Sequence, residues 1–555
     1  MLRRLDSDLR TNERLRFATR HRATERRPPW TAASIARATG WLSVLGVLTL
    51  GSGLSLGQAV HDSENWAADS STESSGSASD LAHRMGIAFA PGLEPSFVDG
   101  IEDGDPSVCE APVTARCWWV DAAAPDGGDG SFAAPFNSFE VVAGYRSSIS
   151  SIEQGLIEAG DHLYVTGVFS MSSYDNGVNN PNIFIRSISD FSGSDPIVIK
   201  SWKGLPRAIF DGEKIDYTPP GWEYGGMVYV DPTSSLDMRI ENIEIRDAHG
   251  SGIIVVDNVE HLEIANVIVH DTIGNPSGTA GGMALFQRSA LHDYTVRNSV
   301  LYRNSVDEDG NVMGLSDNLG ALSMTSNLGA QTGSTLSIYN NTFTDEVHSI
   351  RHKHSGNVHT DAFFNVFENA FSAVHARSRE TDLHHNVVEN VSVVLVSDAQ
   401  NQNLDTIARI FHNTILDADL LVGTGSGDLS FRREFEYYDN IFFAMDSTEL
   451  FHLARWSNED FDLSGWRSGN NIYVFDDDGM VLYHEGVGFL FDAAMSYLGE
   501  ENSSREDPLL TGNLVPSTGS PACGAASDGG DIGAFSCTLF ADGFETGDLS
   551  LWSNG

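Results

Sequence analysis

An asparagine followed by a short apolar segment recurs nine times between residues 242 and 471. The asparagines are Asn242, Asn266, Asn298, Asn341, Asn365, Asn386, Asn413, Asn440 and Asn471. Successive copies are separated by as few as 21 and as many as 43 residues. This pattern is typical of a parallel β-solenoid, in which each rung supplies three short strands and the loops absorb the extra length. A β-sandwich also has many short strands, but it does not place one residue type at the same turn nine times.

The sequence therefore predicts an all-β fold, a parallel β-helix solenoid with about nine or more rungs. An asparagine at the same turn of every rung is explained by hydrogen bonds between side-chain amides, because neighbouring parallel strands lie about 4.8 Å apart. We therefore expect the nine side chains to align in one turn along the solenoid.

Four cysteines lie in two close pairs at the two ends of the repeat region, Cys109 with Cys117 and Cys523 with Cys537. Two local disulfides that staple the ends are the economical interpretation, although four cysteines allow three connectivities. Neither spacing resembles a zinc site.

Residues 1–59 have a basic segment, an apolar stretch and small residues near Ala59, and we interpret them as a secretory signal peptide. A retained N-terminal membrane anchor is the alternative, and both place the protein outside the cell, secreted or at its surface. Residues 60–108 are polar and acidic, as in a flexible linker. The β-helix domain is expected at 109–537, and 538–555 form a short tail that partly repeats residues 98–107.

The chain carries 77 acidic and 33 basic residues, a formal charge of −44. Ten of the basic residues and four of the acidic ones precede Ala59 and would leave with the signal peptide, which leaves 23 basic and 73 acidic residues and a charge of −50. Such a surface repels nucleic acid and anionic membranes, so neither is expected as a partner of the mature chain, which we expect to be a monomer. It would also repel an acidic polysaccharide unless cations were placed locally to receive it.

One short stretch, "SIRHKHSG" at 349–356, gathers cations in this acidic chain. If Ile350 points inward, alternation along a strand turns Arg351 and Lys353 outward and His352 and His354 toward the core.

The next rung, "AVHARS", follows with the same phase. His375 and Arg377 lie 24 residues after Arg351 and Lys353, which equals the step from Asn341 to Asn365. We therefore expect these two rungs to form a plate of four cationic or potentially cationic side chains on one outer face. In the preceding rung Ser323 and Thr325 should flank it. Like charges placed this close cost stability, which favours an anionic ligand.

Several segments resemble known proteins. "WWVDAAAPDGGDGSFAAPFNSFEVVA" at 118–143, "AGDHLYVTGVF" at 159–169 and "DPIVIKSWKGLPRAIFDG" at 195–212 look like the opening of right-handed parallel β-helix proteins of the pectin-lyase-like superfamily. "DPLLTGNLVPSTGSPACGAASDGGDIGAF" at 507–535 resembles their closing segment. The resemblance implies the fold and leaves the activity open, because this superfamily holds lyases, hydrolases, epimerases and adhesins.

The pattern "NNTF…SIRHKHSG…FFNVFEN" is also similar to the alginate and chondroitin lyase family. This resemblance places that family's catalytic arginine on Arg351. The family's lysine base would lie about one rung earlier, where this sequence has Gln331 and Thr332. Lys353 is the only lysine after Lys214, so either Lys353 has taken the role of the base or the activity differs.

These residue types suit β-elimination on a uronic acid polymer. Arg351 or Arg377 would neutralise the substrate carboxylate, Lys353 would take the C5 proton, and His375 would protonate the departing O4. The sequence therefore favours a secreted polysaccharide lyase acting on an acidic polysaccharide. The alternatives are a C5-epimerase, a glycoside hydrolase, and a non-catalytic carbohydrate-binding protein or surface adhesin. In the simplest case the cations are an exterior charge ladder paired with Glu346, Asp361 or Glu380.

The long insertion "YRNSVDEDGNVMGLSDN" at 302–318 carries a set of acidic residues that would suit Ca²⁺ as a cofactor. The proposed oxygen ligands are Asp307, Glu308, Asp309 and Asp317. A solvated acidic loop without an ion explains the same residues. A transition-metal site among the histidines of 348–385 is a weaker alternative, because core or ladder histidines are commoner.

Overall fold

The structure is a computed structural model that describes most of residues 104–537. The segments within this range that it leaves undescribed are 140, 143, 149–150, 172–182, 186–194, 216–225, 231–235, 256–258, 275–282, 288–292, 308, 314–319, 325–331, 353–356, 377, 398–405, 419, 425–432, 445–464, 476–479, 485–486 and 512–513. The predicted signal peptide, nearly all of the predicted linker, and the tail lie outside the described residues. No helix among the described residues is long and apolar enough to cross a membrane.

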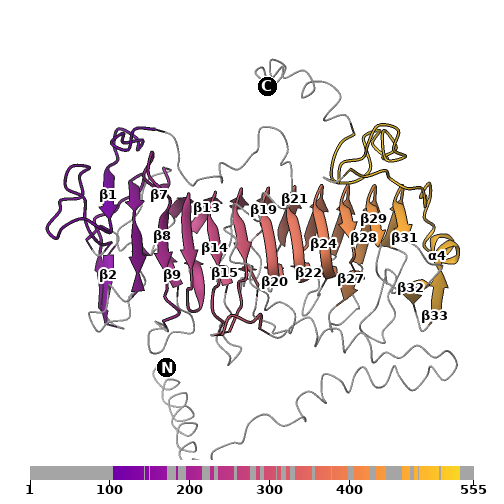
Figure 1. Ribbon diagram of the computed structural model, residues 1–555, viewed down its shortest axis with the longest axis horizontal. Coiled ribbons are helices and arrows are strands. Elements are labelled where there is room, and N and C mark those ends of the chain that lie inside the picture. The colour runs from indigo at the N-terminus through magenta and orange to yellow at the C-terminus, as the bar shows by residue number, and fades with distance from the viewer. Residues whose placement is uncertain are drawn as a thin grey trace, which may run out of the picture. The chain divides into compact units, whose positions relative to one another are not determined.

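Two long sheets of parallel strands form the described chain (Figure 1). The first sheet holds, in order, β1 (Cys117–Asp121), β4 (His162–Thr166), β7 (Ile197–Ser201), β10 (Leu236–Glu241), β13 (Val259–Ala265), β16 (Asp293–Arg297), β19 (Thr332–Tyr339), β21 (Asn357–Phe363), β23 (Glu380–His384), β25 (Thr406–Phe411), β28 (Arg433–Tyr438) and β30 (Trp466–Gly469). Each strand pairs with the equivalent strand one rung away, as in the match of Tyr339 with Phe363.

The second sheet combines two strands from most rungs. It holds β5 (Val168–Ser170), β6 (Ile183–Ile185), β8 (Ala208–Asp211), β9 (Gly226–Val230), β11 (Ile243–Arg246), β12 (Ser251–Val255), β14 (Ile268–His270), β15 (Met283–Gln287), β17 (Val300–Tyr302), β18 (Leu322–Met324), β20 (Thr342–His352), β22 (Val366–Ala376), β24 (Val387–Ser397), β26 (Thr414–Leu416), β27 (Leu420–Thr424), β29 (Ile441–Ala444) and β31 (Ile472–Phe475). In β20, β22 and β24 the two strands of a rung join into one bent strand of 11 residues.

Smaller elements complete the described chain. β2 (Gly144–Ser148) and β3 (Ser151–Gln154) form one antiparallel hairpin, and β32 (Met480–His484) and β33 (Val487–Leu490) form another. The helix α4 (Phe491–Leu498) follows β33 directly. Side chains from both long sheets pack into one continuous apolar core, which extends from Val120 to Tyr473.

Each rung turns a corner on a residue with positive φ. The first corner follows the strand of the first sheet, as at Asn298 and Asn340, and a second corner bends β20 at Asp345. Parallel strands joined in this way form a right-handed parallel β-helix, because such crossovers are right-handed in nearly all proteins. The predicted all-β parallel solenoid is confirmed.

The asparagines of the repeat form two ladders, not one. Six of them, from Asn341 to Asn471, are linked in one continuous series in which each side-chain amide donates to the Oδ1 of the next at 3.0 or 3.1 Å. Their members are Asn341, Asn365, Asn386, Asn413, Asn440 and Asn471. The expectation of nine aligned side chains is wrong for Asn242, Asn266 and Asn298, which lie one position earlier, at the corner itself.

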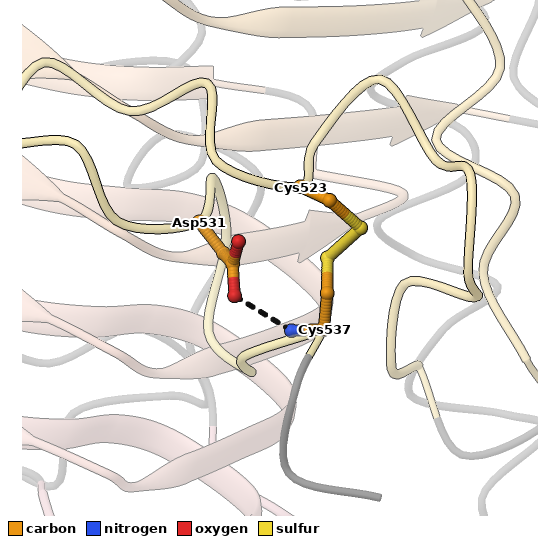
Figure 2. Close-up of side chains that lie close together, drawn as sticks. All are labelled: Cys523, Asp531 and Cys537. Atoms are coloured by element: carbon orange, nitrogen blue, oxygen red, sulfur yellow. Dashed lines mark hydrogen bonds between the residues drawn. A yellow bond between two sulfur atoms is a disulfide. The ribbon is translucent and has the colours of Figure 1, made fainter. Parts of the chain in front are cut away.

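Both disulfides predicted from the sequence are present, Cys109–Cys117 and Cys523–Cys537. Asp531 organises the second one: its carboxylate accepts hydrogen bonds from the backbone of Gly524 and Cys537, at 2.6 and 2.7 Å. Figure 2 shows this carboxylate beside the bridge. The closing segment packs along the asparagine turn, where the backbone N–H of Ala534 donates to the hydroxyl of Thr414.

Candidate functional site

The second half of β20 departs from simple alternation, and this positions the candidate site. In β22 the consecutive residues Ala373 and Val374 both belong to the apolar core, and in β24 Val394 and Leu395 do the same. Two inward residues in a row leave the residues on either side of them facing outward. Each of these rungs therefore presents a pair of outward side chains that are three residues apart in the chain.

In β20 this outward pair is His348 and Arg351, and in β22 it is Ser372 and His375. The strands match in parallel register, which places His348 beside Ser372 and Arg351 beside His375. Ser323 of β18 lies on the other side of Arg351. The stacking of His375 beside Arg351, expected from the 24-residue step, is thus observed, as is the place of Ser323. We call His348, Arg351, Ser372 and His375 the outer cluster.

The inward residues of the same strand follow the expected pattern. Ile350 is part of the apolar core, and His352 lies in the row between Met324 and Ala376, which both belong to that core. The orientation predicted for Arg351 and His352 is therefore the one observed.

The burial of the outer cluster was not expected from the sequence. Arg351 is only 1% exposed and is the largest fully buried side chain among the described residues. His348 and His375 are also buried. The cluster is thus an enclosed polar site, not the open plate on the surface that alternation alone predicts.

His348 makes the most specific contacts in the outer cluster. Its Nδ1 lies 2.7 Å from the hydroxyl oxygen of Ser372. Its ring packs edge-to-face against Phe371, with centroids 5.7 Å apart, and against His375, with centroids 5.2 Å apart. Burial, and then the nearby His375 and Arg351, hold the pKa of His348 well below its usual value, so this imidazole is neutral.

The carboxylates considered as exterior partners of the cations have other contacts. Glu346 lies inside the rung, where its Oε1 accepts hydrogen bonds from the backbone N–H and the side-chain amide of Asn304, at 3.2 and 2.7 Å. Burial raises the pKa of Glu346 well above its usual value, and Asp345 and Asp271 add to this rise. Asp361 contacts His384, and Glu380 lies 3.9 Å from Arg409. The proposal that Glu346 belongs to an exterior charge ladder is therefore wrong.

Two residues predicted for catalysis, Lys353 and Arg377, lie outside the described residues. So do Glu308 and Asp317 of the predicted calcium site. For these four residues the sequence-based roles stay predictions.

The described part of the calcium loop forms a tight turn around one carboxylate. Asp307 Oδ1 accepts hydrogen bonds from the backbone N–H groups of Asp309 and Asn311, both at 2.9 Å, and these bonds lower the pKa of Asp307. Asp307 Oδ1 therefore already has hydrogen-bond donors inside the turn. Asp307 and Asp309 belong to no group of three converging metal ligands within the part of the chain that the structure describes.

Two groups of possible metal ligands do occur among the described residues. One contains Cys523, Asp531 and Cys537, whose sulfur atoms form the disulfide of Figure 2. The other lies on the outer face of the first sheet and contains Asp237, Glu260 and His261. There the Nδ1 of His261 is 2.7 Å from Asp237, and this contact raises the pKa of the imidazole, which indicates an ion pair.

Sequence reasoning missed His348 and Ser372 as members of the site. A signal was present, because "HSIR" at 348–351 and "SAVH" at 372–375 align at the same 24-residue step that matched Arg351 with His375. Strict alternation from Ile350 would place His348 on the inner face, and the parallel register with Ser372 of β22 places it on the outer one.

Comparison with protein-family models gives no match for this chain. Comparison with curated protein sequences gives none either. Comparison with solved structures gives ten matching chains.

Among the solved structures, a GH136 lacto-N-biosidase from Eubacterium ramulus is 10% identical, with a TM-score of 0.41, over 71% of this chain and 67% of the other. XylC in complex with xylose is 11% identical, with a TM-score of 0.43, over 71% and 87%. The pectate lyase Pel9A is 15% identical, with a TM-score of 0.37, over 80% and 99%. Independently of these values, the parallel ladders of the two sheets show that the chain has the right-handed parallel β-helix fold.

Proposed function

We propose that the chain is a secreted lyase that cleaves a uronic acid-containing polysaccharide by β-elimination. The observation that supports this most is the register pair of Arg351 and His375, with the neutral His348 beside them. A guanidinium and two imidazoles on the outer side of neighbouring strands, in a chain with a charge of −44, suit a carboxylate ligand.

The chemistry follows from these groups and from Lys353. Arg351 is 1% exposed, so this mechanism requires the residues around the outer cluster to move aside before the guanidinium binds the carboxylate of a uronate unit. Arg351 then stabilises the negative charge that develops on that carboxylate when the C5 proton leaves. Lys353 takes that proton. The electron pair of the C5–H bond forms the C4–C5 double bond, the C4–O4 bond breaks, and His375 gives a proton to the departing O4. The products are an unsaturated uronate end and a shortened chain.

Ca²⁺ could replace or assist Arg351 as the neutralising charge, and the 302–318 loop supplies the candidate ligands. The described contacts of Asp307 favour arginine in this role, because the carboxylate already accepts two backbone hydrogen bonds. In the proposed reaction Arg351 is therefore the group that neutralises the charge of the substrate carboxylate. The two disulfides fit a protein that works outside the cell.

The test is incubation of the mature chain with alginate, pectate, chondroitin and ulvan, followed by the ultraviolet absorbance of the unsaturated uronate. Release of this product from at least one unmodified polymer supports the lyase. Binding of a polymer without product would instead favour the non-catalytic carbohydrate-binding alternative. A reducing end formed without the double bond would point to hydrolysis.

A further inference from the structure

His348 is held by two kinds of contact at once. Its Nδ1 is fixed by the Ser372 hydroxyl at 2.7 Å, and its ring packs edge-to-face against Phe371 and against His375. Ser372 is completely buried and its strand pairs with that of His348 in register, so the hydroxyl has little freedom to leave.

These contacts determine the state of the imidazole. One ring nitrogen is bound to Ser372, which selects one orientation of the ring, and the role that the hydroxyl takes in this bond, donor or acceptor, decides the tautomer. A proton added to His348 would place a second full charge next to Arg351 in a buried site, and burial already opposes it. His348 is therefore a neutral side chain of fixed orientation, against which the ring of His375 packs.

We propose that His348 is a positioning residue: together with Ser372 it holds the ring of His375 beside Arg351, so that the imidazole and the guanidinium face one uronate unit in a fixed arrangement. The account of the ligand rests on the proposed function, whereas the account of the His348 contacts does not. In the proposed reaction, holding the His375 ring in place keeps it aligned with the departing O4. This raises the rate of proton transfer, which requires hydrogen-bond distance and alignment.

The first experiment needs no substrate. Nitrogen-15 NMR records the histidine side-chain signals of the full chain. The variants His348→Gln and His375→Asn identify which signals belong to these two residues. We expect His348 to stay neutral and in one tautomer from about pH 5 to about pH 8. Ser372→Ala should give a mixture of tautomers for His348 and shift the His375 signals, whereas Ser372→Thr, which keeps the hydroxyl, should preserve both.

Two results would overturn the proposal. One is a His348 that gains its proton near the ordinary imidazole pKa in the unmodified chain. The other is a Ser372→Ala chain whose His348 and His375 signals are unchanged. If Ser372→Ala fails to fold, as judged by its thermal unfolding, the pH titration of the unmodified chain still decides.

The second experiment uses whichever polymer the chain cleaves. Ser372→Ala should lower kcat by about 10- to 100-fold with little change in KM, and Ser372→Thr should restore most of it. His261→Gln is the matched control, because this histidine also pairs with a polar neighbour but lies on the first sheet. Equal kcat for Ser372→Ala and the unmodified chain contradicts the positioning role. If no polymer is cleaved, the proposed function fails, and the NMR results alone decide the inference.

Discussion

Asn340 donates a hydrogen bond from its Nδ2 to the Oδ1 of Asn298, 2.6 Å away, while its chain neighbour Asn341 donates to Asn365 at 3.0 Å. These two adjacent asparagines join the two ladders of the solenoid. Up to Asn340 the asparagine occupies the corner with positive φ, and from Asn341 onward it follows that corner. Asparagine suits both places, because it tolerates positive φ better than most residues and its amide both donates and accepts.

The second ladder should carry more of the stability than the first. The Asn386 side chain donates to Asn413 and to the backbone carbonyls of Ala362 and His384, and it accepts from Asn365. Asn386→Ala leaves these buried groups unpaired and should lower the free energy of unfolding by about 1 to 3 kcal/mol, measured with urea. Asn266→Ala is the matched control with a smaller expected loss, because its amide contact with Asn242 is 3.4 Å long. Equal losses in both variants would contradict the division into two ladders.

The buried Glu346 should make stability depend on pH in an unusual direction. Because its pKa is raised in the folded chain, its contribution to stability is fully present below its usual pKa of about 4.5 and is lost as pH rises through the folded value. Glu346→Gln keeps an oxygen acceptor for Asn304 and removes this titration. The variant should therefore be more stable than the unmodified chain at pH 8, by about 1 to 3 kcal/mol, and the gain should shrink toward pH 5. Urea unfolding at both pH values measures it, and a gain independent of pH would refute the assignment.

Calcium binding at the 302–318 loop is directly measurable. If Asp309 and its acidic neighbours hold the ion, calorimetric titration of the full chain with millimolar Ca²⁺ gives a binding signal that Asp309→Ala removes. Glu158→Ala is the control, since this side chain is 72% exposed and belongs to neither group of possible metal ligands among the described residues. Absence of any signal in the unmodified chain would remove Ca²⁺ from the reaction and leave Arg351 as the neutralising charge.

Lys353 and Arg351 have different expected roles, and substitutions separate them. Lys353→Met keeps much of the side-chain length but deletes the base, so turnover should fall by several orders of magnitude while the polymer is still bound. Kinetics and equilibrium binding on the same polymer measure the two effects. Full activity of Lys353→Met would exclude a lysine base and direct attention to His375.

Arg351→Lys retains a charge but loses the planar fork that matches a carboxylate, so it should weaken both binding and turnover. Arg467→Lys is the control, because this arginine belongs to the first sheet and its side chain is largely exposed. A binding protein without activity would show losses of affinity that depend on salt in Arg351→Lys, and no product with the unmodified chain.

The rungs and the match of Arg351 with His375 could be predicted from the sequence alone, and the cysteine spacing favoured the two disulfides that the structure contains. Each of these depends on residue counts along the chain, and a parallel solenoid converts a constant step in sequence directly into neighbours in space. The 24-residue step from Asn341 to Asn365 therefore sufficed to pair β20 with β22.

The position of individual side chains around a rung follows from tertiary packing, about which the repeat spacing carries no information. The corner at Asn340 shifts the ladder by one residue, and the interior place of Glu346 depends on Asn304 in another rung. The two inward residues in β22 bring Ser372 to the outer face, and the register with β20 places His348 beside it. A shift of one residue reverses which face a side chain takes but leaves the spacing of the repeats unchanged. Counting residues therefore finds the rungs, and the packing of each corner against its neighbours selects the residues that form the site.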